Sequence, residues 1–383
     1  MMRARVPGLI VAIVMILLVL GIVILASASS VRGETYFLDA QYFLKRQLIW
    51  LGVALFVCAL CARIDYHVWR KLAFPIGLLS LFLLVVVLIP GIGVRIGGSR
   101  RWLHLGPVSL QPSEAAKLAT VILFSAWMAL MGPRMRNLKE GLLLPLMALG
   151  LFCGLIFLEP DFGTTVLIGM VGMLLLYLGG TRIWILGIIA LLGLAGFVVA
   201  VIHDPVRLGR VLAFLRPDLY PAVAYHLGQS KDAFSLGGFA GRGLGESIQK
   251  HFYLPEAHTD FILAIIGEEL GVIATVGVAL LFLGLMACGF FVARQTPDPF
   301  GRHLAVGITL MHVIQAGINI GVVTGAGPTK GIPLPFISYG GSSLIIALAG
   351  IGILVNIARQ ALAFERDDET FDGLDAIDSA KSG

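Results

Sequence analysis

The sequence predicts an all-α polytopic membrane protein with about ten transmembrane helices. Of its 383 residues, 58% are hydrophobic and only 13% are charged, and the mean hydropathy is +0.93. Soluble domains are usually about a quarter charged, so this composition excludes an ordinary soluble enzyme. The second observation is a series of apolar runs, each long enough to cross a hydrocarbon layer about 30 Å thick. Ten such runs lie at residues 8–29, 47–63, 72–90, 113–131, 141–158, 163–180, 183–203, 262–293, 303–323 and 341–360.

The first and last segments set the limits of this membrane domain. The run at 8–28 has no small-residue cleavage site followed by a soluble domain, so it is interpreted as a retained span. The eighth run is longer than a crossing requires, which predicts a tilted, kinked or extended helix. Residues 1–360 are expected to form the membrane domain, with a large polar loop at about 204–261 between the seventh and eighth spans. Residues 361–383 are acidic and sparse in apolar side chains, which is typical of a disordered tail.

Lysine and arginine residues indicate the orientation, because cytoplasmic loops carry more of them than short outer loops. With the N-terminus inside, fourteen of the 28 lie in cytoplasmic segments and seven in short outer loops. Both termini are therefore expected in the cytoplasm, with the 204–261 loop outside. The outer loop 91–112 is an exception, because it carries Arg95, Arg100 and Arg101 on the disfavoured side. Cations that do not serve topology are candidates to bind an anion.

Nucleotide motifs are absent from the sequence. GAGPTKG (325–331) lacks the G-x-x-x-x-G-K-[ST] order of a P-loop, and GRGLG (241–245) is not G-x-G-x-x-G and follows no predicted strand. The net charge of +5 is accounted for by topology, so no nucleic-acid partner is expected. No nucleotide cofactor is expected either, so an enzyme of this kind would take its energy from the substrate.

QPSEAAKL (111–118) opens the fourth span and brings two charges into the membrane. Glu114 and Lys117 are spaced i, i+3, so they share a helix face and can pair. Each charge costs roughly 2.5–3.5 kcal/mol inside a span, so both are expected to face protein or water. Two interpretations stay open: a structural ion pair that locks the bundle, and a polar floor beneath an outward-facing cavity.

Two further polar segments lie on the outer side. In LEPDFGT (158–164), Asp161 could cap the sixth span or face a cavity. In PTKGIPLPFISYGGSS (328–343), the prolines exclude a continuous helix, and irregular backbone at membrane depth is tolerated only inside protein or beside a watery cavity. There, Lys330 adds a cation, and Ser342 stands near a helix N-terminus whose free N–H groups suit phosphate.

HFYLPEAHTDFI (251–262) places Asp260 at the lip of the eighth span, where it could be a helix cap, half of an ion pair or a base. Outer cations beside a carboxylate suit transfer of a sugar from a lipid pyrophosphate. The cations would stabilise the leaving group, and the carboxylate would accept the proton of the attacking hydroxyl. A lipid-phosphate transporter fits the same pattern. Glu256 and His258 are interpreted mainly as residues that shape the loop around Asp260.

Six segments, in order along the chain, resemble the SEDS family (shape, elongation, division and sporulation). They are SASS (27–30), GGSRRWLHLGP (97–107), QPSEAAKLA (111–119), EPDFGT (159–164), GLGESIQKHFYLPEAHTDFILAIIGEELG (243–271) and PTKGIPLPFISYGGSS (328–343). The matches span the chain except for the acidic tail, and the last two segments are most similar to the division branch. One departure is Glu159, where glutamine is common in the family.

The resemblance implies a peptidoglycan glycosyltransferase of the bacterial cytoplasmic (inner) membrane, which polymerises lipid II into glycan strands on the outer face during septal synthesis. It implies that Asp260 is the general base and that Glu114, Lys117, Arg100 and Arg101 stand at family positions, with undecaprenyl pyrophosphate as the leaving group. The implied partners are lipid II, the nascent lipid-linked glycan, a class B penicillin-binding protein and other membrane proteins of the division or elongation complex. A divalent cation, Mg²⁺ or Mn²⁺, could bridge the pyrophosphate. The alternatives are a lipid II flippase and a scaffold that recruits division proteins.

Overall fold

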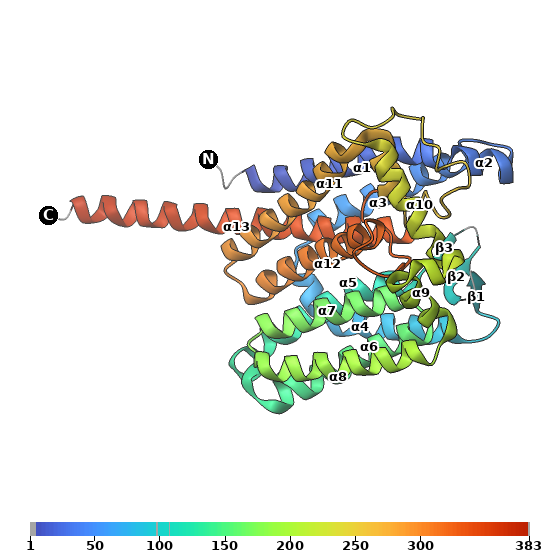
Figure 1. Cartoon of the computed structure of the whole chain (residues 1–383). Coiled ribbons are helices and arrows are strands. Elements are labelled where there is room, and N and C mark those ends of the chain that lie inside the picture. Colours follow the sequence, from blue (N-terminus) through green and yellow to red (C-terminus); the bar gives the residue numbers. More distant parts are fainter. Residues whose placement is uncertain (1–4, 97–98, 107, 382–383) are drawn as a thin grey trace.

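The computed structural model describes residues 5–96, 99–106 and 108–381. Helices dominate these residues, and their order along the chain is that of the predicted apolar runs and polar loops (Figure 1). Their bounds are Val6–Ala28 (α1), Ser30–Phe37 (α2), Tyr42–Arg63 (α3), His67–Leu88 (α4), Pro112–Met131 (α5), Leu144–Leu158 (α6), Phe162–Leu178 (α7), Ile183–Ile202 (α8), Pro205–Leu215 (α9), Pro221–Gly237 (α10), Ile262–Gln295 (α11), Pro299–Val323 (α12) and Gly341–Lys381 (α13).

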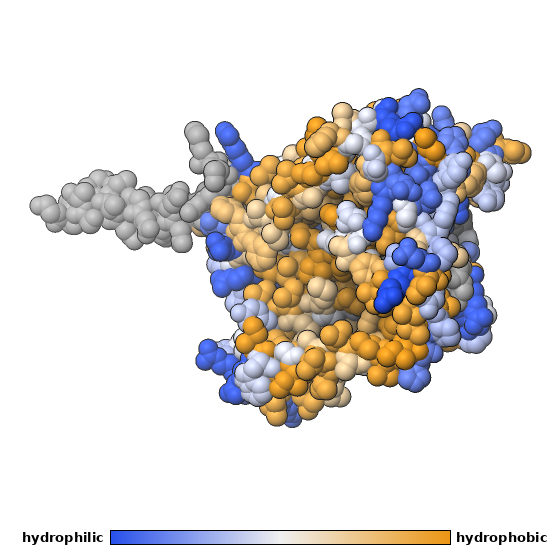
Figure 2. Space-filling model, viewed as in Figure 1, coloured by the Kyte–Doolittle hydropathy of each residue, from blue (hydrophilic) through white to orange (hydrophobic). Residues whose placement is uncertain are grey.

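The membrane character of the fold is confirmed. Within the described part of the chain, nine helices are long and apolar enough to cross a membrane, and the shorter apolar helix α7 packs among them against α5, α6 and α12. Together they account for the ten predicted spans. The surface in Figure 2 is apolar across the middle of the bundle and hydrophilic towards its two ends, as expected of a protein that crosses a bilayer.

The two ends of the bundle differ in content. The N-terminus and the C-terminal part of α13 lie at one end, whereas α2, α9, α10 and the strands lie at the other (Figure 1). The helices α5, α12 and α13 are the most deeply buried spans, and α3 and α8 leave most of their apolar surface exposed. The polar loops singled out in the sequence therefore gather at the end away from the termini, over the centre of the bundle.

The loop at 91–112 contains a small sheet that the sequence did not predict. Strands β1 (Gly93–Ile96), β2 (Ser99–Leu105) and β3 (Val108–Leu110) form an antiparallel sheet in the order β1-β2-β3. Short strands of this kind carry little periodic signal beside long apolar helices, and pairing between neighbours in the chain stabilises them. Because successive residues of a strand point to opposite faces, the sheet also separates the side chains of Arg100 and Arg101.

The long eighth span, α11, is kinked, which is one of the three alternatives (tilted, kinked or extended) that its length predicted. At Gly271 the backbone leaves the helical region, with φ 79° and ψ −176°. The backbone of the preceding loop fills the break: the N–H groups of Arg242 and Gly243 donate to the carbonyls of Glu268 and Glu269, both at 3.0 Å. A Cβ at Gly271 would lie 2.3 Å from the carbonyl oxygen of Phe239, so only glycine fits. The kink leaves a short, buried first segment of α11 directly after Asp260.

The last helix continues beyond the predicted membrane domain. The sequence predicts a disordered tail at 361–383, whereas α13 continues as a helix to Lys381. In Figure 1 this part projects away from the bundle at the end that carries both termini. The segment includes Ala, Leu, Glu and Arg, which have high helix propensity. The boundary of the membrane domain at residue 360 stays a prediction.

Candidate active site

A cavity of about 610 Å³ opens at the end of the bundle away from the termini. Its walls come from β2, the turn between α6 and α7, the end of α8, the helices α9 and α10, and the segments 256–261 and 328–331. Most of these elements are far apart in the chain. The titratable side chains that line the cavity are Arg101, Asp161, Arg207, Arg210, His226, Glu256, Asp260 and Lys330.

Asp260 presents a free carboxylate to this cavity. Its backbone is fixed, because the Nδ2 of Asn319 on α12 donates to its carbonyl oxygen at 2.8 Å. Among the described residues, no side chain forms an ion pair or hydrogen bond with the Asp260 carboxylate. A Cβ at position 331 would lie 2.6 Å from Asp260 Oδ2, so the glycine at this position leaves room for the Asp260 carboxylate. Burial, reinforced by the negative charge of Glu256, raises the pKa of Asp260 to about 7.

Asp161 is the N-cap of α7, so the capping interpretation is correct. Its carboxylate accepts hydrogen bonds from the backbone N–H and the hydroxyl of Thr164, at 3.2 and 3.0 Å. Gln111 Nε2 and the Ser113 hydroxyl donate to its Oδ2 at 3.2 and 3.3 Å. Asp161 is buried, and these four bonds occupy its oxygens. It faces the cavity as a fixed negative group and is not available as a second base.

Arg101 is held in the cavity wall by the turn between α6 and α7. Its side chain donates to the carbonyl oxygens of Glu159 and Pro160, and its Nη1 lies 4.0 Å from Asp161 Oδ1. Arg100, next along β2, is not in the cavity wall and pairs across the sheet with Arg95. The strand thus separates two arginines that the sequence motif presents as a pair.

Glu159 is a completely enclosed carboxyl group near the site. The residue is fully buried, and within the described part of the chain neither carboxylate oxygen has a hydrogen-bond partner. Burial, reinforced by the negative charge of Asp161, raises its pKa to about 9. A neutral Glu159 offers nearly the same shape as glutamine, which explains how the acid is accommodated beside Arg101.

Lys330 lies in the cavity wall, as a cation for an anionic ligand should. Its Nζ is 4.9 Å from the centroid of the Phe197 ring at the end of α8, a cation–π contact. Burial lowers the pKa of the Lys330 ammonium. The irregular segment that carries it was predicted to lie either inside protein or beside a watery cavity, and residues 328–331 lie beside a cavity.

Glu114 and Lys117 lie below the cavity and do not line it. They are buried and form an ion pair of 2.8 Å between Lys117 Nζ and Glu114 Oε2. Lys117 also donates to Gln315 at 2.8 Å, and Gln315 donates to the Pro333 carbonyl at 2.8 Å. The pair therefore fits the structural interpretation, because it ties α5 to α12 and supports, through Gln315, the segment that carries Lys330. It does not form the floor of this cavity.

Ser342, at the start of α13, lies outside the cavity wall. Its hydroxyl donates to the Ser109 carbonyl of β3 at 2.8 Å and so joins the last span to the sheet. Glu256 and His258 shape the loop, as expected: Glu256 lies 3.3 Å from Arg32, and the His258 ring packs 4.9 Å from that of Phe43. Glu256 additionally faces the cavity.

Sequence reasoning missed two cavity arginines, Arg207 and Arg210 on α9, and His226 on α10. The Arg207 guanidinium stacks 3.8 Å from the Phe162 centroid and pairs with Asp204 at 2.7 Å. The available signal was DPVRLGR (204–210), a capped helix start with two arginines three residues apart inside the predicted outer loop. The length of this loop exempts its cations from the topology rule, so the charge count across the membrane gives no sign of their role.

Comparison with known proteins decides the family. The sequence-family model of the FtsW/RodA/SpoVE cell cycle proteins matches residues 8–362 of this chain. The chain belongs to this family. A relative from Trichlorobacter lovleyi, named probable peptidoglycan glycosyltransferase FtsW, is 45% identical over 340 residues, 88% of this chain and 89% of the relative. Stage V sporulation protein E of Bacillus subtilis is 40% identical, over 92% of this chain and 96% of the relative.

Solved structures agree with membership of the FtsW/RodA/SpoVE family. A chain from a structure described as a peptidoglycan synthase complex that coordinates polymerization and crosslinking superposes with a TM-score of 0.77 at 29% identity, covering 92% of this chain and 97% of that one. The rod shape determining protein RodA of Thermus thermophilus superposes with a TM-score of 0.67 at 27% identity, covering 92% and 96%.

The cavity of this FtsW/RodA/SpoVE family member does not form a protein cage for the expected divalent cation. Among the described residues, no three His, Cys, Asp or Glu side chains stand close enough together to hold a metal ion. The carboxylates of Asp161 and Glu256 are already engaged, with Thr164 and with Arg32. Asp260 alone is free, so the protein offers one free carboxylate here, and a divalent cation that also binds the pyrophosphate stays a prediction.

Proposed function

We propose that the chain is a peptidoglycan glycosyltransferase that polymerises lipid II on the outer face of the bacterial cytoplasmic membrane, in septal synthesis during cell division. One observation carries the proposal: a free carboxylate with a pKa of about 7, Asp260, shares a cavity with Arg101 and Lys330. A general base works best when its pKa is near the working pH. The names of the relatives support the substrate class.

In the proposed reaction, Asp260 accepts the proton of the acceptor sugar's 4-hydroxyl. The hydroxyl oxygen then forms a bond to the anomeric carbon of the lipid-linked donor as the bond from that carbon to phosphate breaks, with inversion. Undecaprenyl pyrophosphate leaves with the bonding electron pair. Arg101 and Lys330 stabilise its charge, together with the α9 arginines in the same cavity.

Lysine and arginine are in excess in the loops at the end of the bundle that carries the termini, which supports cytoplasmic termini. In this orientation the 610 Å³ cavity opens on the outer face of the membrane. The proposed partner is a class B penicillin-binding protein, whose transpeptidase would crosslink the new glycan. The structural relative from a complex that coordinates polymerization and crosslinking supports this pairing. Other proposed partners are membrane proteins of the division complex.

A flippase would need polar groups through the whole membrane depth. The 610 Å³ cavity that contains Asp260 is lined by residues from one end of the bundle. This placement supports chemistry at one face over transport between two faces.

The test is polymerisation of purified lipid II by the purified full chain, with and without a candidate class B partner. Asp260→Asn removes the base with little change in shape, and we expect a loss of 10²–10⁴-fold in rate. Asp218→Asn is the matched control, because Asp218 is an exposed carboxylate of the same loop outside the cavity wall. Near-normal polymer from Asp260→Asn would contradict the assignment of Asp260 as the base. An Asp260→Asn variant that makes no polymer but still supports division would favour the scaffold alternative.

A further inference from the structure

A second cavity, of about 140 Å³, lies at the end of the bundle that carries the termini. It is formed where the connection between α5 and α6 meets the turn between α7 and α8. Nothing in the proposed glycosyl transfer uses it. Its wall is made of Met135, Arg136, Asn137, Leu138, Leu142, Thr181, Arg182 and Ile185.

The two walls are tied together without any ligand. The Thr181 hydroxyl on one side donates to the Gly141 carbonyl on the other at 2.7 Å. A Cβ at Gly141 would lie 1.7 Å from the carbonyl oxygen of Met135, so the backbone of the α5–α6 connection closes tightly on itself there. Met135 and Thr181 are buried beneath the cavity. The cavity is therefore pre-formed.

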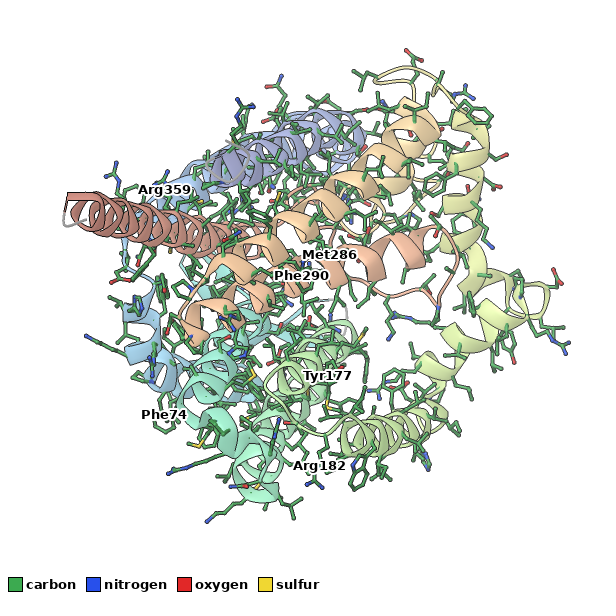
Figure 3. All side chains as sticks on the ribbon, turned by 90° about the vertical axis from the view of Figure 1, so that its left-hand side faces the viewer. Phe74, Tyr177, Arg182, Met286, Phe290 and Arg359 are labelled. Atoms are coloured by element: carbon green, nitrogen blue, oxygen red, sulfur yellow. The ribbon has the colours of Figure 1, made fainter. Side chains whose placement is uncertain are left out.

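Two guanidinium groups face this cavity from separate segments. Arg136 belongs to a short 3₁₀ turn after α5, and Arg182 immediately precedes α8. Both residues are exposed, and within the described part of the chain neither forms an ion pair or a hydrogen bond through its side chain. Figure 3 shows Arg182 at the end of the bundle that faces the viewer, where both termini emerge.

The surroundings of the two arginines are apolar and belong to the membrane boundary. Leu138, Ile183 and Trp184 expose 69%, 65% and 60% of their surface beside the cavity. An exposed tryptophan at the end of a span is typical of the level of the lipid headgroups. The apolar face of α8 continues from there into the membrane, with little of it packed against the bundle. A ligand here would meet cations at its head and hydrocarbon beneath.

We propose that this cavity binds the phosphodiester headgroup of an anionic membrane phospholipid. Two arginine forks can hold one phosphate, and basic pockets between helices at the membrane boundary recognise anionic headgroups. The acyl chains would lie along the exposed face of α8 and fill the space that the protein leaves unpacked there. The site does not depend on the proposed glycosyl transfer, so either can fail without the other.

Lipid binding to the purified full chain in detergent tests the site, with native mass spectrometry as the readout. Phosphatidylglycerol and phosphatidylcholine serve as anionic and zwitterionic probes. Arg136→Gln/Arg182→Gln should weaken phosphatidylglycerol binding by about tenfold or more, because charge-assisted hydrogen bonds to phosphate are lost. The matched control is Arg134→Gln/Lys139→Gln, which removes the same charge from the same connection outside the cavity wall. It should change binding less than about threefold.

Equal losses in the two double variants would show diffuse surface attraction and overturn the site. Equal binding of phosphatidylcholine would overturn the requirement for an anion. Inorganic phosphate and glycerol phosphate form the third arm: if either displaces the lipid at the lipid's own concentration, the ligand is a free phosphate and the lipid assignment is wrong. If the Gln variant unfolds, Arg136→Lys/Arg182→Lys keeps the charge without the fork and should still bind more weakly than wild type.

Discussion

Asn319 holds Asp260 in place by a hydrogen bond of 2.8 Å from its Nδ2 to the Asp260 carbonyl oxygen. The same amide nitrogen donates to the carbonyl of Ile332 at 2.7 Å. One buried side chain of α12 thus fixes both the free carboxylate and the segment that carries Lys330. The relative position of base and cation is set from beneath the cavity, through backbone atoms.

We expect Asn319→Leu to lower polymerisation by about tenfold or more, because a base displaced by about 1 Å loses much of its effect. The freed carboxylate would also reach water, so its pKa would fall towards the ordinary value. The acidic limb of the pH–rate profile should therefore move to lower pH. Asn356→Leu is the control, because Asn356 is also buried and hydrogen-bonded but lies near Tyr66, away from the cavity. Similar pH profiles for the two variants would contradict the positioning role.

The wild-type rate should depend on pH through Asp260. The active form is the deprotonated carboxylate, so activity should rise as pH increases through about 7 and then level off. The negative charge of Glu256 contributes to the raised pKa, so Glu256→Gln should shift this limb to lower pH. Single-turnover rates on lipid II from acidic to alkaline pH measure both effects. A limb near the ordinary aspartate pKa of about 4 in the wild type would show that Asp260 is not desolvated.

Neighbouring arginines of β2 should differ sharply in effect. Arg101→Gln removes a cation from the cavity and should reduce the rate by about 10²-fold, the usual cost of losing one donor to a developing anion. Arg100 lies outside the cavity wall, so the rate of Arg100→Gln should stay within about threefold of the wild-type rate. Steady-state kinetics on lipid II, with both variants at matched expression, compare them. Equal losses would mean that the strand does not orient the two residues as described.

Gly271→Ala should destabilise the protein by about 1–3 kcal/mol or more, because it forces a side chain into a positive-φ position. The new Cβ would also collide with the Phe239 carbonyl. Gly277 lies on the same helix, and a Cβ there would have no atom within 4 Å. Gly277→Ala should therefore stabilise the protein by roughly 0.5–1 kcal/mol. Thermal unfolding in detergent reports both changes. An unaffected midpoint for Gly271→Ala would show that the kink is not required.

Glu159→Gln should stabilise the fold at alkaline pH. The folded carboxyl has a pKa raised to about 9 from an ordinary 4.5, so the folded state keeps a proton that the unfolded state releases. The stability that this group contributes is therefore fully present below about pH 4.5 and is lost as pH rises towards 9. The difference in unfolding temperature between variant and wild type should grow steadily across that range. A constant difference would contradict the neutral state of Glu159.

Much of the fold was predictable, because the length of an apolar run is a local property. The ten predicted spans correspond to helices, and the alternative of a kink in the eighth is explained by one glycine, Gly271. The small sheet at 93–110 was missed, because its strands are short and pair only with each other. The acidic composition of residues 361–383 is typical of a disordered tail, whereas α13 continues as a helix to Lys381.

Asp260, Asp161 and Lys330 were selected from sequence by chemistry and by family resemblance, and all three line one cavity. Sequence alone could not tell Arg101 from Arg100, since the pleat of β2 assigns them to different faces. Nor could it show that Lys117, paired with Glu114, donates to Gln315, or that the pair lies outside the cavity wall. The α9 arginines could have been predicted from the sequence, because they follow a capped helix start that carries two cations.

The sequence by itself determined that this chain crosses a membrane about ten times, to which family it is similar, and which residue types could do chemistry at one end. Hydrophobicity, helix breaking and charge are properties of neighbouring residues, so they are readable along the chain. Only the tertiary structure decided which of those residues share a cavity and which support it. Positions 260 and 330 meet because α12, through Asn319 and Gln315, binds loops that no local pattern connects. Position 101 joins them because Arg101 donates to carbonyl oxygens of the turn between α6 and α7.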